Sequence, residues 1–301
     1  MRKPDCIFVG YQKSGTTFLR NYMTQHPGLD FTREGGFFLR SNPREITIEG
    51  YLDKFPNPPS PNVVWIDMLE SLAIGVMPKN PERWEKERLI PGMGIDGFNL
   101  TPSPIQTAHN IRNIMGETRI IIMIRNQITW MKSNYLHYYT GLPQDKNSFT
   151  DFLTTLEGKA LLYSGMYDMV IRHYVNTFGK NAIHVIPLEK LHISQKESLT
   201  ELCNFLDVSY RQFTPDPGAR NTGRKAVPSK MVNAIGNTPL YPLIRKIKQT
   251  IPFGAKLTSK FVNSEVINPE TKELLQSLYS ASNFNSSQIL GMDLAQLGYP
   301  I

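Results

Sequence analysis

The stretch Val9-Gly10-Tyr11-Gln12-Lys13-Ser14-Gly15-Thr16-Thr17-Phe18, close to the N-terminus, decides the fold. The apolar run at residues 6–9 has the composition of a buried strand, and residues 16–26, followed by Pro27, are expected to form a helix. A strand, a glycine-framed turn and a helix in this order direct free backbone N–H groups and the positive end of the helix dipole at an anion. The stretch therefore predicts an α/β fold with an anion-binding loop.

The position of the lysine in this loop indicates which anion it binds. Gly10-x4-Gly15 has the spacing of a Walker P-loop, but Thr16-Thr17 stand where a nucleotidase carries Lys-Ser/Thr. The lysine lies inside the loop instead, at Lys13, where it suits a shorter anhydride than a triphosphate. No metal-binding aspartate stands nearby, so we expect a nucleotide with a 5′ two-anion group that is bound without metal. The alternative is a simple glycine turn with an incidental lysine.

A second signal is the run Arg119-Ile120-Ile121-Ile122-Met123-Ile124-Arg125-Asn126. An uninterrupted apolar run of this length predicts a central parallel strand that is covered on both faces. Ligands of such sheets bind beyond the carboxyl ends of the strands, which is where Arg125 projects. Its planar cationic group suits a second phosphate, and Ser133 follows eight residues later in an expected helix at 128–139.

Together these motifs resemble the sulfotransferases that use 3′-phosphoadenosine 5′-phosphosulfate (PAPS). The 5′-phosphosulfate loop of that family typically reads P-K-(S/A/G)-G-T-T, and here Gln12 replaces the proline. The family's 3′-phosphate site is an arginine at a strand end and a serine eight residues on, which Arg125 and Ser133 match. The resemblance implies that PAPS is bound by the loop residues Lys13, Ser14, Gly15, Thr16, Thr17 and Phe18, with adenosine 3′,5′-bisphosphate as product and no metal required. It also implies an α/β, P-loop-like three-layer sandwich, with a central parallel sheet flanked by helices.

Glu34 is the candidate general base. In the carbohydrate-sulfating branch, the stretch after the first helix often reads K-E-x-x-F-F, and its glutamate takes the proton from the acceptor hydroxyl. Glu34 stands three residues before Phe37-Phe38, as that pattern requires. The alternative is a solvated loop carboxylate that pairs with Arg33 or Arg40. His109 is a poor match to the catalytic histidine of the cytosolic branch, and we expect it on a helix surface.

A basic loop late in the chain is the last candidate nucleotide contact. In the family, a loop of this kind closes over the nucleotide, and the resemblance assigns this role to Asn221, Thr222, Gly223, Arg224 and Lys225. A solvated charged turn is the alternative.

Composition bounds the class of protein. The chain has 301 residues, a net charge of +7 and a charged fraction of 20%, which is ordinary for a globular protein. The mild basic excess suits an anionic cofactor or an acidic acceptor, and no basic run interleaved with aromatic residues argues for nucleic acid. No apolar stretch approaches the ~20 residues that a membrane span needs. We expect a single domain at 1–301, with a proline-rich insertion at 56–92 near the acceptor cleft.

The acceptor and the compartment complete the prediction. Glu34 with its two phenylalanines and the ending Gly298-Tyr299-Pro300 resemble the carbohydrate branch, which implies transfer to a hydroxyl or amine of a carbohydrate. Leu100 replaces a lysine of the heparan-type enzymes, so a small alcohol, phenol or lipid is the second possibility. A P-loop kinase or a nucleotide-binding non-enzyme is a distant third. Only two cysteines and no leader segment favour the cytoplasm, with the Golgi lumen as the alternative for a trimmed catalytic domain.

Overall fold

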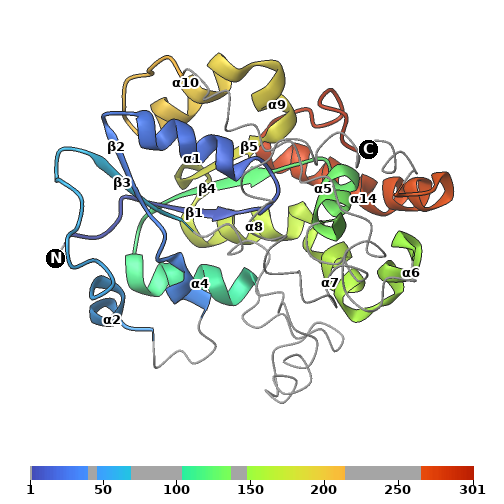
Figure 1. Ribbon diagram of the computed structural model, residues 1–301, viewed down its shortest axis with the longest axis horizontal. Helices are drawn as coiled ribbons and strands as arrows, with labels where there is room; N and C mark the ends of the chain where they lie inside the picture. Colours follow the sequence, from blue (N-terminus) through green and yellow to red (C-terminus); the bar gives the residue numbers. More distant parts are fainter. Residues whose placement is uncertain (1, 40–45, 69–103, 137–147, 214–265) are drawn as a thin grey trace, which may run out of the picture.

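The computed structural model describes residues 2–39, 46–68, 104–136, 148–213 and 266–301 (Figure 1). Its centre is a five-stranded parallel sheet in the order β2-β3-β1-β4-β5. The strands are β1 (Cys6–Gly10), β2 (Leu29–Thr32), β3 (Val64–Met68), β4 (Arg119–Ile124) and β5 (Ile183–Pro187).

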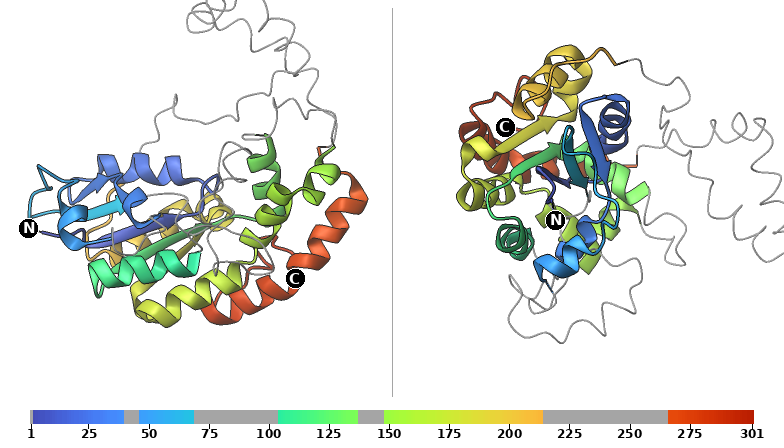
Figure 2. Two further views of the ribbon diagram at one scale, coloured as in Figure 1. Left: turned by 90° about the horizontal axis from the view of Figure 1, so that it is seen from below. Right: turned by 90° about the vertical axis from the view of Figure 1, so that its left-hand side faces the viewer.

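Helices cover both faces of this sheet (Figures 1 and 2). One face carries α1 (Thr16–Gln25), α9 (Leu188–Ile193) and α10 (Gln195–Phe205), and the other carries α4 (Pro104–Met115) and α8 (Tyr167–Phe178) with α14 (Pro269–Leu290) beside it. The remaining helices are α2 (Ile48–Leu52), α5 (Gln127–Asn134), α6 (Phe149–Thr154) and α7 (Leu156–Ser164), with the short turns η1 (Gly35–Leu39) and η4 (Lys180–Ala182). The predicted three-layer, P-loop-like sandwich is confirmed. Within the described residues, every helix is too short or too polar to span a bilayer.

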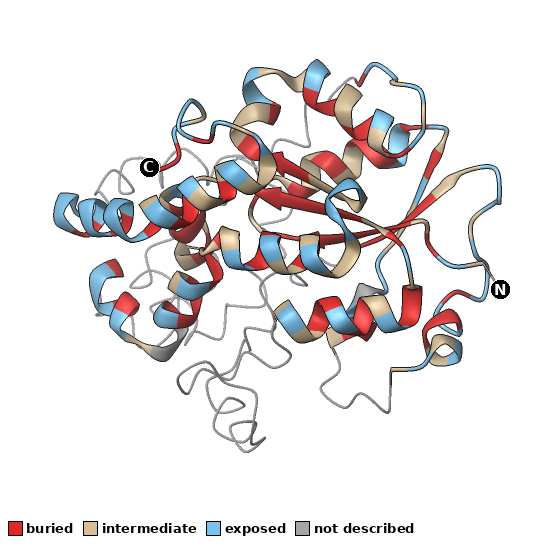
Figure 3. Ribbon diagram, turned by 180° about the vertical axis from the view of Figure 1, so that it is seen from behind, coloured by how far each residue is buried: buried red, intermediate tan, exposed pale blue. Residues whose placement is uncertain are grey.

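The two outer layers follow from the alternation of side chains along buried strands. In β4, Ile120, Ile122 and Ile124 belong to the core shared with α4 and α8, whereas Ile121 and Met123 belong to the core shared with α1 and α10. All five are fully buried, and Figure 3 shows the centre of the sheet as mostly buried. An apolar run without polar interruption is therefore what a strand with two covered faces requires.

Two helix boundaries follow from local backbone geometry. α6 and α7 are separate helices, because Thr155 between them has extended backbone and its hydroxyl accepts the Gly158 N–H at the start of α7. The terminal helix α14 begins at Pro269 and continues to Leu290, where Gly291 ends it in the left-handed conformation.

The segment 56–92 departs from the expected insertion. Val64–Met68, inside that segment, forms β3, which pairs with β2 on one side and β1 on the other. This part of the segment is an inner strand of the sheet, and residues 69–92 lie outside the described part of the chain. A single domain over 1–301 stays a prediction.

Gly15 stands where the structure leaves no room for a side chain. Its φ is +91°, and a Cβ atom there would lie 2.5 Å from Leu188 Cδ1 and 3.3 Å from Met123 Cε. Gly116 also has a positive φ, +74°, but has no atom within 4 Å of such a Cβ. We expect Gly116→Ala to lower the free energy of unfolding by about 1 kcal/mol and Gly15→Ala by about 2–4 kcal/mol in urea titrations. Equal losses of unfolding free energy in the two variants would show that the Leu188 side chain can move aside at little cost.

His184 in β5 predicts a loss of stability in acid. Burial lowers its pKa to about 4, Glu201 opposes this shift and Lys190 adds to it. Since the unfolded value is about 6.5, the unfolded chain takes up the proton first as the pH falls from 6.5 towards 4, and stability is lost in that window. Between pH 7.5 and 4.5, we expect the wild type to lose about 2.5 kcal/mol more than His184→Gln. The exposed His192 supplies the control, and a His184→Gln profile that follows the wild type and His192→Gln would contradict the prediction.

Candidate functional site

Five strand ends define one edge of the molecule. Because all strands are parallel, the segments that leave them lie along the same edge of the sheet. The loop with Lys13 follows β1, and Glu34 follows β2. Asp67 is the next-to-last residue of β3, Arg125 follows β4, and Glu189 follows β5. The sequence-predicted residues at 13–18, 34 and 125 therefore lie along one edge of the sheet.

The loop after β1 is attached to β4 and the helix behind it. Tyr11 donates its backbone N–H to the Met123 carbonyl at 2.6 Å, and the Trp130 indole donates to the Gln12 carbonyl at 2.8 Å. Lys13 has a φ of 64°, a left-handed conformation that is uncommon for a residue with a side chain. These contacts to β4 and α5 fix the backbone conformation of the loop.

The start of α1 is suited to an anion. Within the described residues, its N-cap Gly15 offers no side chain, so first-turn N–H groups such as those of Thr16 and Thr17 stay available to a ligand. The Ser14 hydroxyl is buried and has no hydrogen-bond partner in the described chain. A bound anion would satisfy both kinds of donor. The N–H of Phe18, in contrast, is already bonded to the Gly15 carbonyl, and its ring packs on Phe213.

Arg125 joins the two predicted phosphate sites. Its Nη1 donates to the Lys13 carbonyl at 3.0 Å, and its Nε donates to Thr129 Oγ1 at 2.9 Å. Burial lowers its pKa, the carboxylate of Glu189 opposes this, and an arginine remains protonated. Within the part of the chain that the structure describes, these bonds use two of its five N–H donors, and the other donors could bind a ligand. Tyr167 is fully buried, and its hydroxyl donates to the Arg125 carbonyl at 2.7 Å.

Ser133 lies on α5, the helix that leaves the same strand end. Asn126 caps this helix, since its side chain accepts the N–H groups of Ile128 and Thr129. Ser133 is half-buried in the last turn of α5. The structure thus places Arg125 at the base of α5 and Ser133 near its far end.

Glu34 is exposed on a loop whose backbone is fixed. Its N–H donates to Asp67 Oδ1 at 2.8 Å, and its carbonyl accepts the Phe37 N–H at 3.0 Å. Phe37 and Phe38 are buried against Tyr51, so this loop is anchored in the core. The carboxylate therefore stands in solvent while the chain on either side of it is held.

Asp67 is a residue that sequence reasoning missed. It is fully buried and accepts three hydrogen bonds, from the Thr32 hydroxyl at 2.8 Å, the Glu34 N–H at 2.8 Å and the Tyr51 hydroxyl at 2.7 Å. Burial raises its pKa, and these bonds oppose the shift. The available signal was an aspartate that interrupts the apolar run at residues 63–68. Its position makes it the anchor of the Glu34 loop.

A second missed group supports the β4 end. Glu189 accepts the Asn126 N–H at 3.0 Å and the Tyr299 hydroxyl at 2.7 Å, and the Asn126 amide donates to the Gly298 carbonyl at 2.6 Å. Burial, with Glu189 beside it, raises the pKa of Tyr299 well above its usual value. The C-terminal residues are thereby attached to the strand end that carries Arg125.

Other candidates are placed more simply. The predicted contacts at 221–225 lie outside the described residues. His109 is exposed on α4, with its ring 5.2 Å from that of His173, so the expected surface position is confirmed. The described residues contain no cluster of three or more His, Cys, Asp or Glu side chains that could hold a metal ion.

Comparison with known proteins gives a family. The model described as the sulfotransferase family matches residues 4–212. A solved sulfotransferase from Alicyclobacillus acidocaldarius is 19% identical with a TM-score of 0.60, and the match covers 99% of this chain and 100% of that one. At this identity the likeness is one of fold.

Two further solved structures are more distant. A mouse sulfotransferase complexed with PAP is 16% identical with a TM-score of 0.44, covering 96% of this chain and 88% of that one. The sulfotransferase domain of the Synechococcus PCC 7002 olefin synthase is 14% identical with a TM-score of 0.42, covering 91% and 94%. No curated protein matches the chain by sequence.

The hydrogen bonds to Asp67 predict that the protein is less stable when this carboxylate is replaced by an amide. In Asp67→Asn one acceptor oxygen becomes an NH2 donor that faces another donor, so we expect the free energy of unfolding to fall by about 1–3 kcal/mol. Asp30→Asn on β2 is the matched control, because Asp30 is exposed. Urea unfolding of both variants checks this, and equal small losses would contradict the anchoring role.

Proposed function

This chain belongs to the sulfotransferase family, and we propose that it transfers the sulfuryl group of PAPS to a hydroxyl or amine of a carbohydrate. The observation that carries the proposal is the hydrogen bond from Arg125 to the Lys13 carbonyl. It brings the predicted 3′-phosphate and 5′-phosphosulfate sites together at one edge of the sheet, as a doubly phosphorylated adenosine requires.

The residues at this edge fit such a donor. The buried Ser14 hydroxyl and the uncapped start of α1 would take the 5′ group, together with Lys13, Gly15, Thr16 and Thr17. Arg125 and Ser133 would take the 3′-phosphate, and the loop at 221–225 would close over the nucleotide. Lys13 and the helix start supply the positive charge, so the proposal requires no metal.

In-line transfer from PAPS passes through a loose transition state in which negative charge builds on the leaving bridging oxygen. Lys13 and the backbone N–H groups beside it stabilise that charge, because they are positioned before the reaction begins. The product is adenosine 3′,5′-bisphosphate.

Glu34 accepts the proton of the acceptor in this proposal. Its carboxylate is exposed, whereas the competing carboxylate, Asp67, is fully buried with both oxygens hydrogen-bonded. Asp67 instead fixes the backbone of Glu34, so that the base stays at one place along the edge. A general base must first lie within hydrogen-bond reach of the proton that it abstracts.

Glu34 with Phe37-Phe38 supports a carbohydrate acceptor over the second candidate, a small alcohol, phenol or lipid. We place the protein in the cytoplasm, since Cys6 and Cys203 are both buried and unpaired.

Three substitutions separate the proposed roles. We expect Glu34→Gln to lower kcat about 10²–10⁴-fold with unchanged affinity for adenosine 3′,5′-bisphosphate, because it removes only the base. Lys13→Ala should lower kcat about 10²–10³-fold. Arg125→Ala should mainly raise the KM for PAPS and weaken bisphosphate binding about tenfold or more. Calorimetry without Mg²⁺ and a radiolabelled PAPS assay over carbohydrate and small-alcohol acceptors measure these effects.

Glu49→Gln is the matched control, since Glu49 is an exposed carboxylate on α2. Near-native turnover by Glu34→Gln would overturn the assignment of the base. Binding of ATP in place of the bisphosphate would overturn the donor.

A further inference from the structure

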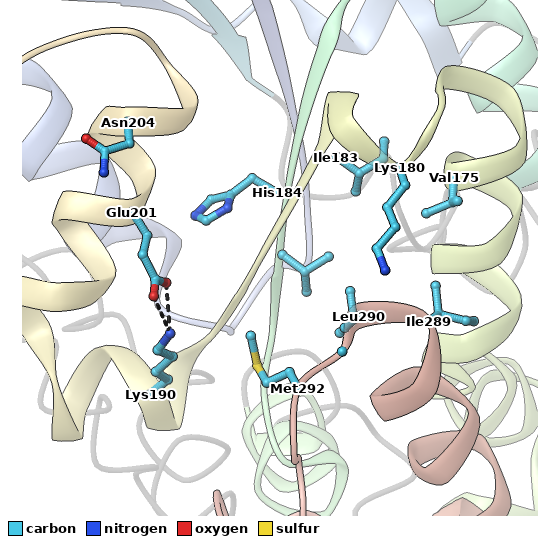
Figure 4. A pocket seen from close by; sticks show the side chains of 12 residues that line it. Val175, Lys180, Ile183, His184, Lys190, Glu201, Asn204, Ile289, Leu290 and Met292 are labelled. Carbon is cyan, nitrogen blue, oxygen red and sulfur yellow. Dashed lines mark hydrogen bonds and ion pairs between the residues drawn. The ribbon is translucent and has the colours of Figure 1, made fainter.

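A cavity of about 540 Å³ lies beside β5, the edge strand of the sheet (Figure 4). Its size falls in the range of small-molecule sites, about 300–1,000 Å³. It is lined by Val175, Lys180, Ile183, His184, Val185, Lys190, Glu201, Asn204, Ile289, Leu290, Gly291 and Met292. None of these residues belongs to the proposed sulfuryl-transfer site.

One wall of the cavity is polar, and its lysine is fully paired. Lys190 pairs with Glu201 at 2.7 Å and lies 4.0 Å from Glu197, which is not among the lining residues. His184 stands beside this pair, with its ring stacked 5.1 Å from that of Phe205. Its Nε2 is buried and has no hydrogen-bond partner in the described chain. This imidazole nitrogen is therefore unsatisfied but closed off from solvent.

The opposite side carries the uncompensated charge. Lys180 extends from η4 towards the cavity (Figure 4). Within the described residues, no carboxylate lies within ion-pair distance of its ammonium, and the lining contains two lysines but one glutamate. The net charge of the lining is therefore +1. Between the two sides lie the apolar side chains of Leu290 and Met292, and Val185 also lines the cavity.

We propose that this cavity is a second ligand site, which binds a small amphipathic monoanion. The anionic head, a sulfate ester or a carboxylate, pairs with Lys180, and the aliphatic or aromatic body lies against Val185, Leu290 and Met292. A single negative charge matches the single uncompensated lysine, and the apolar body matches the surface between the walls.

Calorimetry on the whole chain with hexyl sulfate, hexanoate and hexanol tests the site. We expect both anions to bind the wild type and hexanol to bind much more weakly, because it lacks the charge. Lys180→Ala should weaken the binding of both anions about tenfold, the usual value of one charge-assisted hydrogen bond. A preference between hexyl sulfate and hexanoate identifies the head group.

Two variants control for charge and for location. Lys196→Ala, an exposed lysine on α10 outside the cavity, should bind as the wild type does. Met292→Trp fills the cavity and should abolish binding, with folding checked by circular dichroism. If Lys13→Ala weakens binding and Lys180→Ala does not, the anion sits at the strand ends and the proposal is overturned. Binding that none of these variants changes also overturns it.

Discussion

The hydrogen bond from Arg125 to the Lys13 carbonyl is the contact on which the functional edge depends. It connects the segments that leave β1 and β4, two neighbouring strands in the sheet. The same loop is held by the Trp130 indole, which belongs to the helix that Arg125 introduces. One strand end thus determines both the shape of the anion-binding loop and the position of the second cationic group.

Charges are sorted along this edge by the order of the strands. The cationic residues Lys13 and Arg125 follow the inner strands β1 and β4. The carboxylates of Glu34 and Asp67 belong to β2 and β3 on one side of them, and Glu189 follows β5 on the other. A carboxylate in direct contact with Lys13 would form an ion pair and be a poor proton acceptor. The sheet therefore keeps the proposed base near the donor site but on different strands from its cations.

The sequence predicted the parts of this arrangement that depend on local signals. The apolar runs of β1 and β4, the glycine loop and Arg125 were found because each is continuous in the chain and bounded by turn residues. β2 and β3 were missed, since β2 has four residues of which only Leu29 is buried, and β3 follows a proline-rich stretch. Asp67 and Glu189 were missed for a related reason. Their partners stand 16–35 and 63–110 positions away, so only the tertiary fold reveals what they hold.

The attachment of Gly298 and Tyr299 to Asn126 and Glu189 has a consequence for biosynthesis. A ribosome makes the loop with Lys13 first and these two residues nearly three hundred positions later. A nascent chain can form the sheet while it is still being extended, but the network behind Arg125 stays incomplete until Gly298 and Tyr299 have left the exit tunnel. The support behind Arg125 is thus added to a sheet and a loop that can already have formed.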